Sequence, residues 1–130
     1  MTILSAKDIE KLNVACTALM EEEKIRHAGV INSLGHLIAG GFKKGVPSLL
    51  TDDKVRMVYM QMQLDLHMRQ DLDDILGPID YIASRRKNQL IITVPIDENL
   101  VLISAEPNAD DKKIIKKAEE LFDAITITSF

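Results

Sequence analysis

Residues 51–76 read TDDKVRMVYMQMQLDLHMRQDLDDIL, a stretch with the spacing of one long helix. At about 100° per residue, its apolar side chains fall into two stripes on opposite sides of the helix. The first stripe consists of Val55, Val58, Tyr59, Met62 and Leu66. The second stripe, called the outer stripe below, consists of Met57, Met60, Leu64 and Met68. Polar flanks separate the stripes, with Arg56, Gln63, His67 and Asp74 on one flank and Lys54, Gln61 and Asp65 on the other.

A helix on the surface of a small domain ordinarily carries one apolar stripe and leaves its other side polar. The first stripe can therefore face the core of the chain, whereas the outer stripe needs another partner. A protein surface is the partner that this pattern favours. The sequence thus predicts association, rather than catalysis, as the function of the long helix.

The 130 residues fit a single domain over residues 1–130, long enough to bury a core without disulfides or metal. The longest apolar runs, residues 90–94 and 100–103, are too short to span a bilayer, so we expect no membrane insertion. Asp8 and Glu10 stand where a signal peptide would have its apolar stretch. These features predict a cytoplasmic protein.

The net charge of −4 opposes sequence-independent attraction to a phosphate backbone, so we expect no nucleic-acid partner. Positive residues cluster at residues 85–87 (Arg-Arg-Lys) and at residues 43–44 (Lys-Lys). In both places a solvated hairpin or loop is favoured over a binding patch. The single Cys16 shares helical spacing with Ile9, Leu12 and Leu19, which favours a buried thiol on a packing face.

The first half of the chain reads as a helix followed by a hairpin. Ser5 and Asp8 form a near capping box that opens the first helix, and the acids at residues 21–23 end it. Residues 25–32 and 36–42 are strand-like and flank a short loop in which Gly35 supplies a positive φ. Gly40 and Gly41 indicate either a bulge or a close backbone approach in the second strand.

The second half begins with a loop over residues 43–50, after which Thr51 caps the long helix and Gly77-Pro78 stops it. Three strand-like runs follow at residues 79–86, 89–94 and 100–105, and a last helix begins near residues 108–111. The short loops predict antiparallel neighbours. We therefore expect an α+β fold in the order α-β-β-α-β-β-β-α, with a five-stranded antiparallel sheet and helices on both faces. The long helix should cover one face and the terminal helices the other.

The tail, residues 126–130, is β-prone but short. An ordered edge segment and a flexible end both remain open for it.

The hairpin AGVINSLGHLIA at residues 28–39 has an apolar strand, a short polar loop with Gly, and a second apolar strand. A long helix and a meander follow it, with QLIITV at residues 89–94 and LVLIS at residues 100–104 as the central strands. This arrangement over residues 25–122 resembles the roadblock / dynein light chain family. Members of that family share the profilin-like fold with longin domains and, more distantly, with sensory PAS-type domains.

The resemblance implies a homodimer in which the long helices of two subunits pack together and the outermost meander strand pairs across the axis. It also implies a role as a regulatory scaffold for a partner protein such as a small GTPase. The predicted interface comprises Met57, Met60, Leu64, Met68 and Tyr81. The alternative is a PAS-like sensory module that holds a small ligand between sheet and helix, for which the space left by Gly40 and Gly41 is the hint.

No residue pattern in the chain supports a reaction, so we expect no enzyme, no catalytic residue and no cofactor. His27, His36 and His67 lack neighbours at zinc spacing, and packing or flank positions explain them better than metal binding. A monovalent copper site made of Met57, Met60, Met68 and His67 is the bolder alternative, but a Met stripe is more often a packing surface. The acids at residues 71, 73 and 74 read as a solvated helix end. The glycines at residues 40–45 lack the Gly-Lys-Ser/Thr of a phosphate loop.

Overall fold

The computed structural model describes residues 4–125. It contains the predicted sequence of elements, with one short helix added after the long one. The elements are α1 (Ala6–Leu19), β1 (Ile25–Ile31), β2 (Leu37–Phe42), α2 (Asp52–Gln70), α3 (Asp73–Leu76), β3 (Ile82–Arg85), β4 (Leu90–Ile96), β5 (Asn99–Ala105) and α4 (Asp111–Asp123). The tail at residues 126–130 lies outside the described residues.

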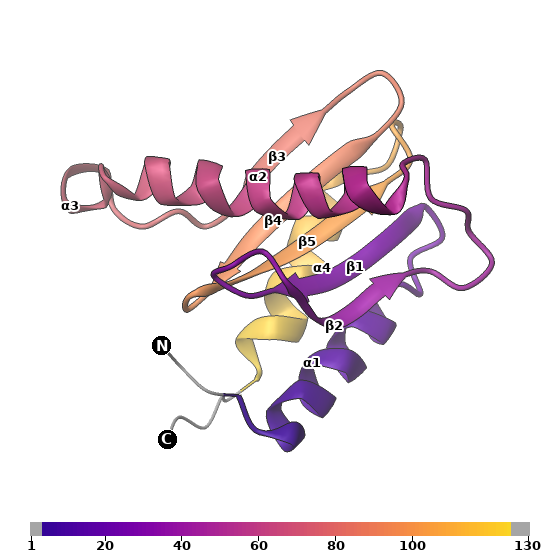
Figure 1. The fold of residues 1–130 in the computed structure, drawn as a ribbon, viewed down its shortest axis with the longest axis horizontal. Coiled ribbons are helices and arrows are strands. Elements are labelled where there is room, and N and C mark those ends of the chain that lie inside the picture. The colour runs from indigo at the N-terminus through magenta and orange to yellow at the C-terminus, as the bar shows by residue number, and fades with distance from the viewer. Residues whose placement is uncertain (1–3, 126–130) are drawn as a thin grey trace.

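The five strands form one antiparallel sheet, as predicted, and the structure gives the strand order β2-β1-β5-β4-β3 (Figure 1). β1 pairs with β2 on one side and with β5 on the other, and β4 joins β5 to β3. The register between β1 and β2 shifts after Val30, which marks an irregularity near the hairpin. β2 and β3 are therefore the two edge strands of the sheet.

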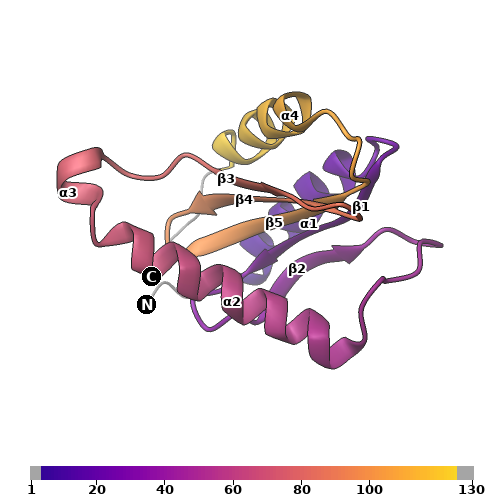
Figure 2. The ribbon, with the colours of Figure 1, turned by 90° about the horizontal axis from the view of Figure 1, so that it is seen from above.

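Helices cover both faces of this sheet, as Figure 2 shows. α1 and α4 lie on one face, and α2 lies on the other, so the predicted layering is confirmed. Strand residues alternate between the two layers, because successive side chains of a strand point to opposite faces. On β5, for example, Val101 and Ile103 belong to the α1/α4 core, and Leu100 and Leu102 belong to the α2 core.

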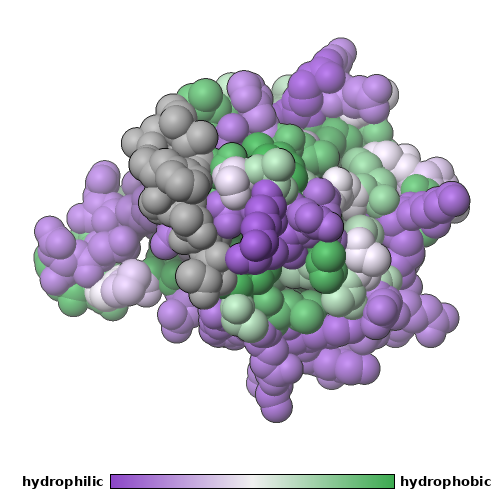
Figure 3. Space-filling model, turned by 90° about the horizontal axis from the view of Figure 1, so that it is seen from below, coloured by the Kyte–Doolittle hydropathy of each residue, from purple (hydrophilic) through white to green (hydrophobic). Residues whose placement is uncertain are grey.

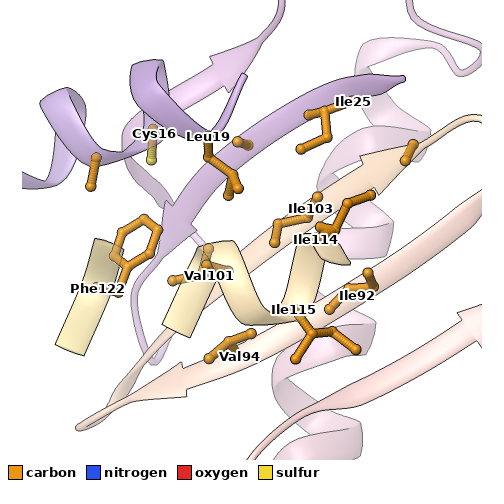
Figure 4. Packing of buried hydrophobic residues seen from close by; sticks show 14 of the residues in the cluster. Cys16, Leu19, Ile25, Ile92, Val94, Val101, Ile103, Ile114, Ile115 and Phe122 are labelled. Carbon is orange, nitrogen blue, oxygen red and sulfur yellow. The ribbon is translucent and has the colours of Figure 1, made fainter. Parts of the chain in front are cut away.

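The core between the sheet and α1/α4 is the larger one (Figure 4). Leu12, Cys16 and Leu19 enter it from α1, and Ile114 and Phe122 enter it from α4. The pairing of Ser5 with Asp8 makes a complete capping box at the start of α1, which confirms the predicted helix start. Cys16 has no exposed surface, as predicted, and burial raises the pKa of its thiol to about 12.

Gly40 allows α1 to approach the edge strand β2. Its φ is 71°, and a Cβ at this position would lie 2.2 Å from the Ala28 carbonyl oxygen and 2.8 Å from the Cys16 sulfur. Of the two predicted alternatives for Gly40, the close approach is the one that the structure contains. The space beside Gly40 is filled by the thiol of Cys16, so it leaves no room for a ligand.

The prediction of one helix over residues 51–76 is wrong at its end. α2 stops at Gln70, and the chain turns at Asp71 and Leu72 before α3 begins. The physical reason is the run of aspartates after Gln70, because Asp is a weak helix former and because Asp73 and Asp74 are favoured in the first turn of a new helix rather than near the end of a continuing one. Gly77, with a φ of 83°, then ends α3 as expected.

The first meander strand is shorter than the predicted run 79–86, because the chain must return from α3, which lies beyond the sheet (Figure 1). Ile79 packs against the α2 core on the way back, and pairing with β4 begins only at Ile82. Tyr81 therefore lies just before β3 rather than within it. Its side chain is exposed.

Candidate interaction surface

The four side chains of the outer stripe point away from the sheet. Met57 is 46% exposed, Met60 56%, Leu64 58% and Met68 70%. In the first stripe, Tyr59 and Leu66 are buried, and Val55, Val58 and Met62 are half-buried against the same core. Both apolar stripes predicted from the sequence are thus present on α2. Within residues 4–125, the first stripe packs against the sheet and the outer stripe is exposed.

The exposed apolar surface continues past the end of α2. Leu72, Ile75, Leu76 and Tyr81 are all exposed, and Ile75 is the most exposed of them at 81%. Seen from below, this end of the molecule protrudes at the left from the body, with hydrophobic and hydrophilic side chains next to each other (Figure 3). Exposed apolar side chains that adjoin one another are typical of an interaction surface.

Two side chains of α2, Tyr59 and Gln63, make polar contacts that attach the helix to the rest of the chain. The first contact is that of Tyr59, whose hydroxyl lies 2.7 Å from Nε2 of His27, while Nδ1 of the same His27 lies 3.1 Å from the carbonyl oxygen of Leu102. Because a carbonyl only accepts, Nδ1 carries the proton and Nε2 accepts from the tyrosine. Burial lowers the pKa of His27, with the Leu102 carbonyl acting against that shift, and burial raises the pKa of Tyr59 to about 12.

Gln63 provides the second contact and corrects the sequence prediction, which placed it on a polar flank. Its side chain is buried, and Nε2 donates to the carbonyl of Asn32 at 2.7 Å. The reason is the β1–β2 hairpin tip, which reaches over this part of α2 and brings Gly35 against Met60. These contacts fix α2 on the sheet and thereby hold the outer stripe outward.

The two sheet edges differ in how they are covered. At β2, the backbone N–H of Gly40 donates to Oδ1 of Asn13 on α1 at 2.7 Å, and Lys43 just beyond the strand donates to the Glu22 carbonyl at 2.9 Å. At β3, Ala83, Ser84 and Arg85 are exposed, and no other described strand pairs with the outer side. Since an unpaired edge is a template for strand addition, β3 is the edge suited to pairing.

The other candidate sites remain dispersed. His27 is buried in the α2 contact, whereas His36 and His67 are exposed. Within residues 4–125, no group of three or more His, Cys, Asp or Glu side chains is placed to hold a metal ion. The acids at residues 71, 73 and 74 lie around α3. No helix in that same range is long and apolar enough to cross a membrane.

The space between α2 and the sheet is small. A cavity lined by His27, Phe42, Tyr59 and Leu102, among others, has a volume of about 30 Å³. Small-molecule sites usually have several hundred Å³, so this cavity is far smaller than such a site. A ligand of the sensory alternative would need more space between α2 and the sheet than this cavity provides.

Comparisons with known proteins support the fold. A model of the family described as "Family of unknown function (DUF6659)" matches residues 4–125. No curated protein matches this chain in sequence. Among solved structures, one described as "MglB with tetrameric arrangement" has a TM-score of 0.78 at 13% identity, covering 95% of this chain and 90% of that one.

Two further structures show the same fold. A Roadblock/LC7 domain from Streptomyces avermitilis has a TM-score of 0.68 at 10% identity, covering 87% of this chain and 92% of that one. A profilin from Schizosaccharomyces pombe has a TM-score of 0.61 at 13% identity, covering 86% and 94%. At these identities the likeness is one of fold, and it confirms the predicted roadblock-like and profilin-like architecture.

Proposed function

We propose, from the premise that this chain belongs to the DUF6659 family and has the roadblock-type fold, that it is a non-enzymatic homodimeric scaffold. Two copies join through the outer stripes of their α2 helices, and the dimer serves as a regulatory platform for a partner protein. The observation that carries the proposal is the alignment of Met57, Met60, Leu64 and Met68 on the side of α2 opposite its buried residues.

The energetics favour this use of the outer stripe. Full burial of a large apolar side chain contributes about 1.5 to 3 kcal/mol, and these four are about half exposed before association. Together with Tyr81, they offer enough apolar surface to offset part of the association cost, which is about 4 to 15 kcal/mol. Pairing of the open β3 edges would add backbone hydrogen bonds to the same interface. Methionine suits such a contact because its flexible side chain adapts to an apposed surface.

The similar proteins agree with an assembling function. The MglB structure that this chain resembles is described as a tetrameric arrangement. A small GTPase is the partner class that we infer from the roadblock resemblance. The lack of a convergent group of titratable side chains at the outer stripe is consistent with a binding surface rather than a catalytic one.

Light scattering on the purified chain tests the dimer. The wild type should have twice the monomer mass at tens of micromolar, and Leu64→Asp should have the monomer mass, because a carboxylate would be buried in the interface. Val14→Asp is the matched control, since Val14 is a similarly exposed apolar residue on α1, on the other face of the sheet. A wild type that stays monomeric at that concentration would reject the dimer.

A pull-down from native extract tests which protein the chain binds. Wild-type chain should retain a small GTPase that the Leu64→Asp variant retains less well, if the partner binds the assembled dimer. Retention of the same proteins by both variants would place the partner site away from the outer stripe.

A further inference from the structure

A second exposed surface lies where the β3–β4 hairpin meets the loop before α2. It is a depression of about 850 Å³, lined by Leu49, Leu50, Arg86, Lys87, Gln89 and Pro107, among others. We call it the basic depression. It carries two features that the outer stripe does not have, which are uncompensated positive charge and a loop held in a fixed conformation.

The charge comes from the hairpin tip. Arg85 is engaged within the chain, because it donates to the carbonyl oxygens of Pro107 and Ala109 and lies 3.7 Å from a carboxylate oxygen of Asp111. The next two side chains, Arg86 and Lys87, are exposed and have no ion pair or hydrogen bond within residues 4–125. These two cations lie in a chain whose net charge is −4. The sequence favoured a solvated hairpin for all three residues, and the structure separates the first from the other two.

Among the described residues that line the depression, Glu106 is the one acid, and it is paired. Glu106 accepts from Arg26 at 2.9 Å, and Arg26 also donates to the Pro47 carbonyl at 2.7 Å. The side chain of Arg26 is only 15% exposed, and its hydrogen bond to the Pro47 carbonyl attaches the loop to the sheet. The positive charge of Arg86 and Lys87 is therefore not cancelled by a neighbouring carboxylate of the depression.

The loop presents two leucines in a fixed arrangement. Beyond the Arg26 anchor, Ser48 accepts from the N–H of Leu50 at 3.1 Å and donates to its carbonyl at 2.9 Å, which closes a turn around Leu49. Leu49 is nonetheless 56% exposed and Leu50 40% exposed. A loop held by such hydrogen bonds loses less conformational entropy on binding than an unconstrained loop would.

We propose that the basic depression binds an acidic segment of a partner protein that carries apolar side chains between its carboxylates. The carboxylates contact Arg86 and Lys87, and the apolar side chains contact Leu49, Leu50 and Pro107. A polypeptide segment fits better than a nucleic acid, because the described lining residues include no aromatic ring for base stacking. The site is open rather than enclosed, which suits a segment better than a small molecule. This inference does not depend on the proposed dimer.

Fluorescence anisotropy with a labelled eight-residue peptide of Glu and Leu tests the proposal. Wild-type chain should bind this peptide in low salt and should not bind the same peptide with Gln in place of Glu. The double variant Arg86→Glu, Lys87→Glu should bind at least about tenfold more weakly, because both attractive contacts become repulsive. Leu49→Ser with Leu50→Ser should lower the affinity about fivefold or more.

The matched control is Lys112→Glu with Lys116→Glu, an equal charge change at two exposed positions of α4. It should lower the affinity less than threefold, since only the general field of the protein changes. The Leu64→Asp variant should bind the peptide like the wild type, which separates this proposal from that of the dimer. Thermal melts of all variants show that they remain folded.

Three results would overturn the proposal. One is equal binding of the Glu and Gln peptides, and another is an equal loss in the α4 control. The third is tighter binding of a single-stranded oligonucleotide, or of vesicles rich in phosphatidylserine, than of the acidic peptide. Either of those would assign the two cations to phosphate groups instead.

Discussion

The two faces of the sheet differ in how completely their helices use their apolar side chains. On the α1/α4 face, the helices bury Leu12, Leu19 and Phe122 in one large core, and Val14 is the main exposed exception on α1. On the opposite face, only Tyr59, Gln63 and Leu66 of α2 are buried, and the outer stripe is about half exposed or more among residues 4–125. The first face therefore stabilises the monomer, and the second combines a small core with a surface available to a partner.

The largest expected effect lies in the α1/α4 core. Phe122→Ala should lower the free energy of unfolding by about 3 to 5 kcal/mol, because it removes a buried ring and leaves a cavity. Ile75→Ala, at the exposed end beyond α2, should change it by less than about 0.5 kcal/mol. Urea unfolding of both variants at low protein concentration measures the difference. Similar losses for the two would mean that the faces are not distinct.

A glycine pair tests how tightly α1 binds the β2 edge. Gly40→Ala should cost about 2 to 4 kcal/mol, because its Cβ would overlap the Ala28 carbonyl and the Cys16 side chain at a positive φ. Gly45→Ala is the control, since Gly45 also has a positive φ but open space around it, and about 1 to 2 kcal/mol is expected. Thermal unfolding can rank the two. Equal destabilisation would show that backbone strain alone, and not helix packing, determines the cost.

We expect α2 to be attached to the sheet more weakly than α1. Tyr59→Phe removes the hydrogen bond to His27 and leaves the buried Nε2 of His27 without a donor, so it should cost about 1 to 3 kcal/mol. Hydrogen exchange should show faster opening of α2 and little change in α1 or α4. Uniform acceleration across all helices would mean that the α2 layer does not open separately.

The smallest perturbation is pH. Because burial lowers the pKa of His27 in the folded state, the unfolded chain binds a proton at a higher pH than the folded chain does. The contribution of His27 to the free energy of unfolding should therefore be fully present at neutral pH. It should decrease as the pH falls below about 6.5, the ordinary pKa of histidine. The urea midpoint, measured between about pH 7.5 and 5.5, should vary less in His27→Gln than in the wild type, and an equal variation in the two would contradict the role of His27.

Much of this fold follows from periodicity. The alternation of the strand runs and the two stripes of the long helix predicted the element order, the layering and the burial of Tyr59 and Leu66. Periodicity assigns each side chain to a direction, so it works wherever the neighbour in that direction is a regular element. It placed the outer stripe away from the core, as the exposed fractions now show.

Contacts between distant segments could not be predicted in this way. Gln63 is buried because the hairpin tip around Asn32 covers it, and Asn13 caps Gly40 across 27 positions of the chain. A polar residue on a helix flank carries no local signal that another loop will cover it. The break at Asp71 does carry a local signal, because a run of aspartates disfavours a continuing helix, but the acidic pattern by itself predicts a solvated helix end and not the position of the break.

The methionines of α2 provide the most direct measurement of the proposed interface. Mild peroxide oxidation followed by mass spectrometry reports the exposure of each thioether, at nanomolar and at tens of micromolar protein. We expect Met57, Met60 and Met68 to be oxidised rapidly when dilute and to be protected when concentrated, while Met62, which packs toward the sheet, stays the same. Equal oxidation of the outer stripe at both concentrations would contradict an interface between copies of this chain.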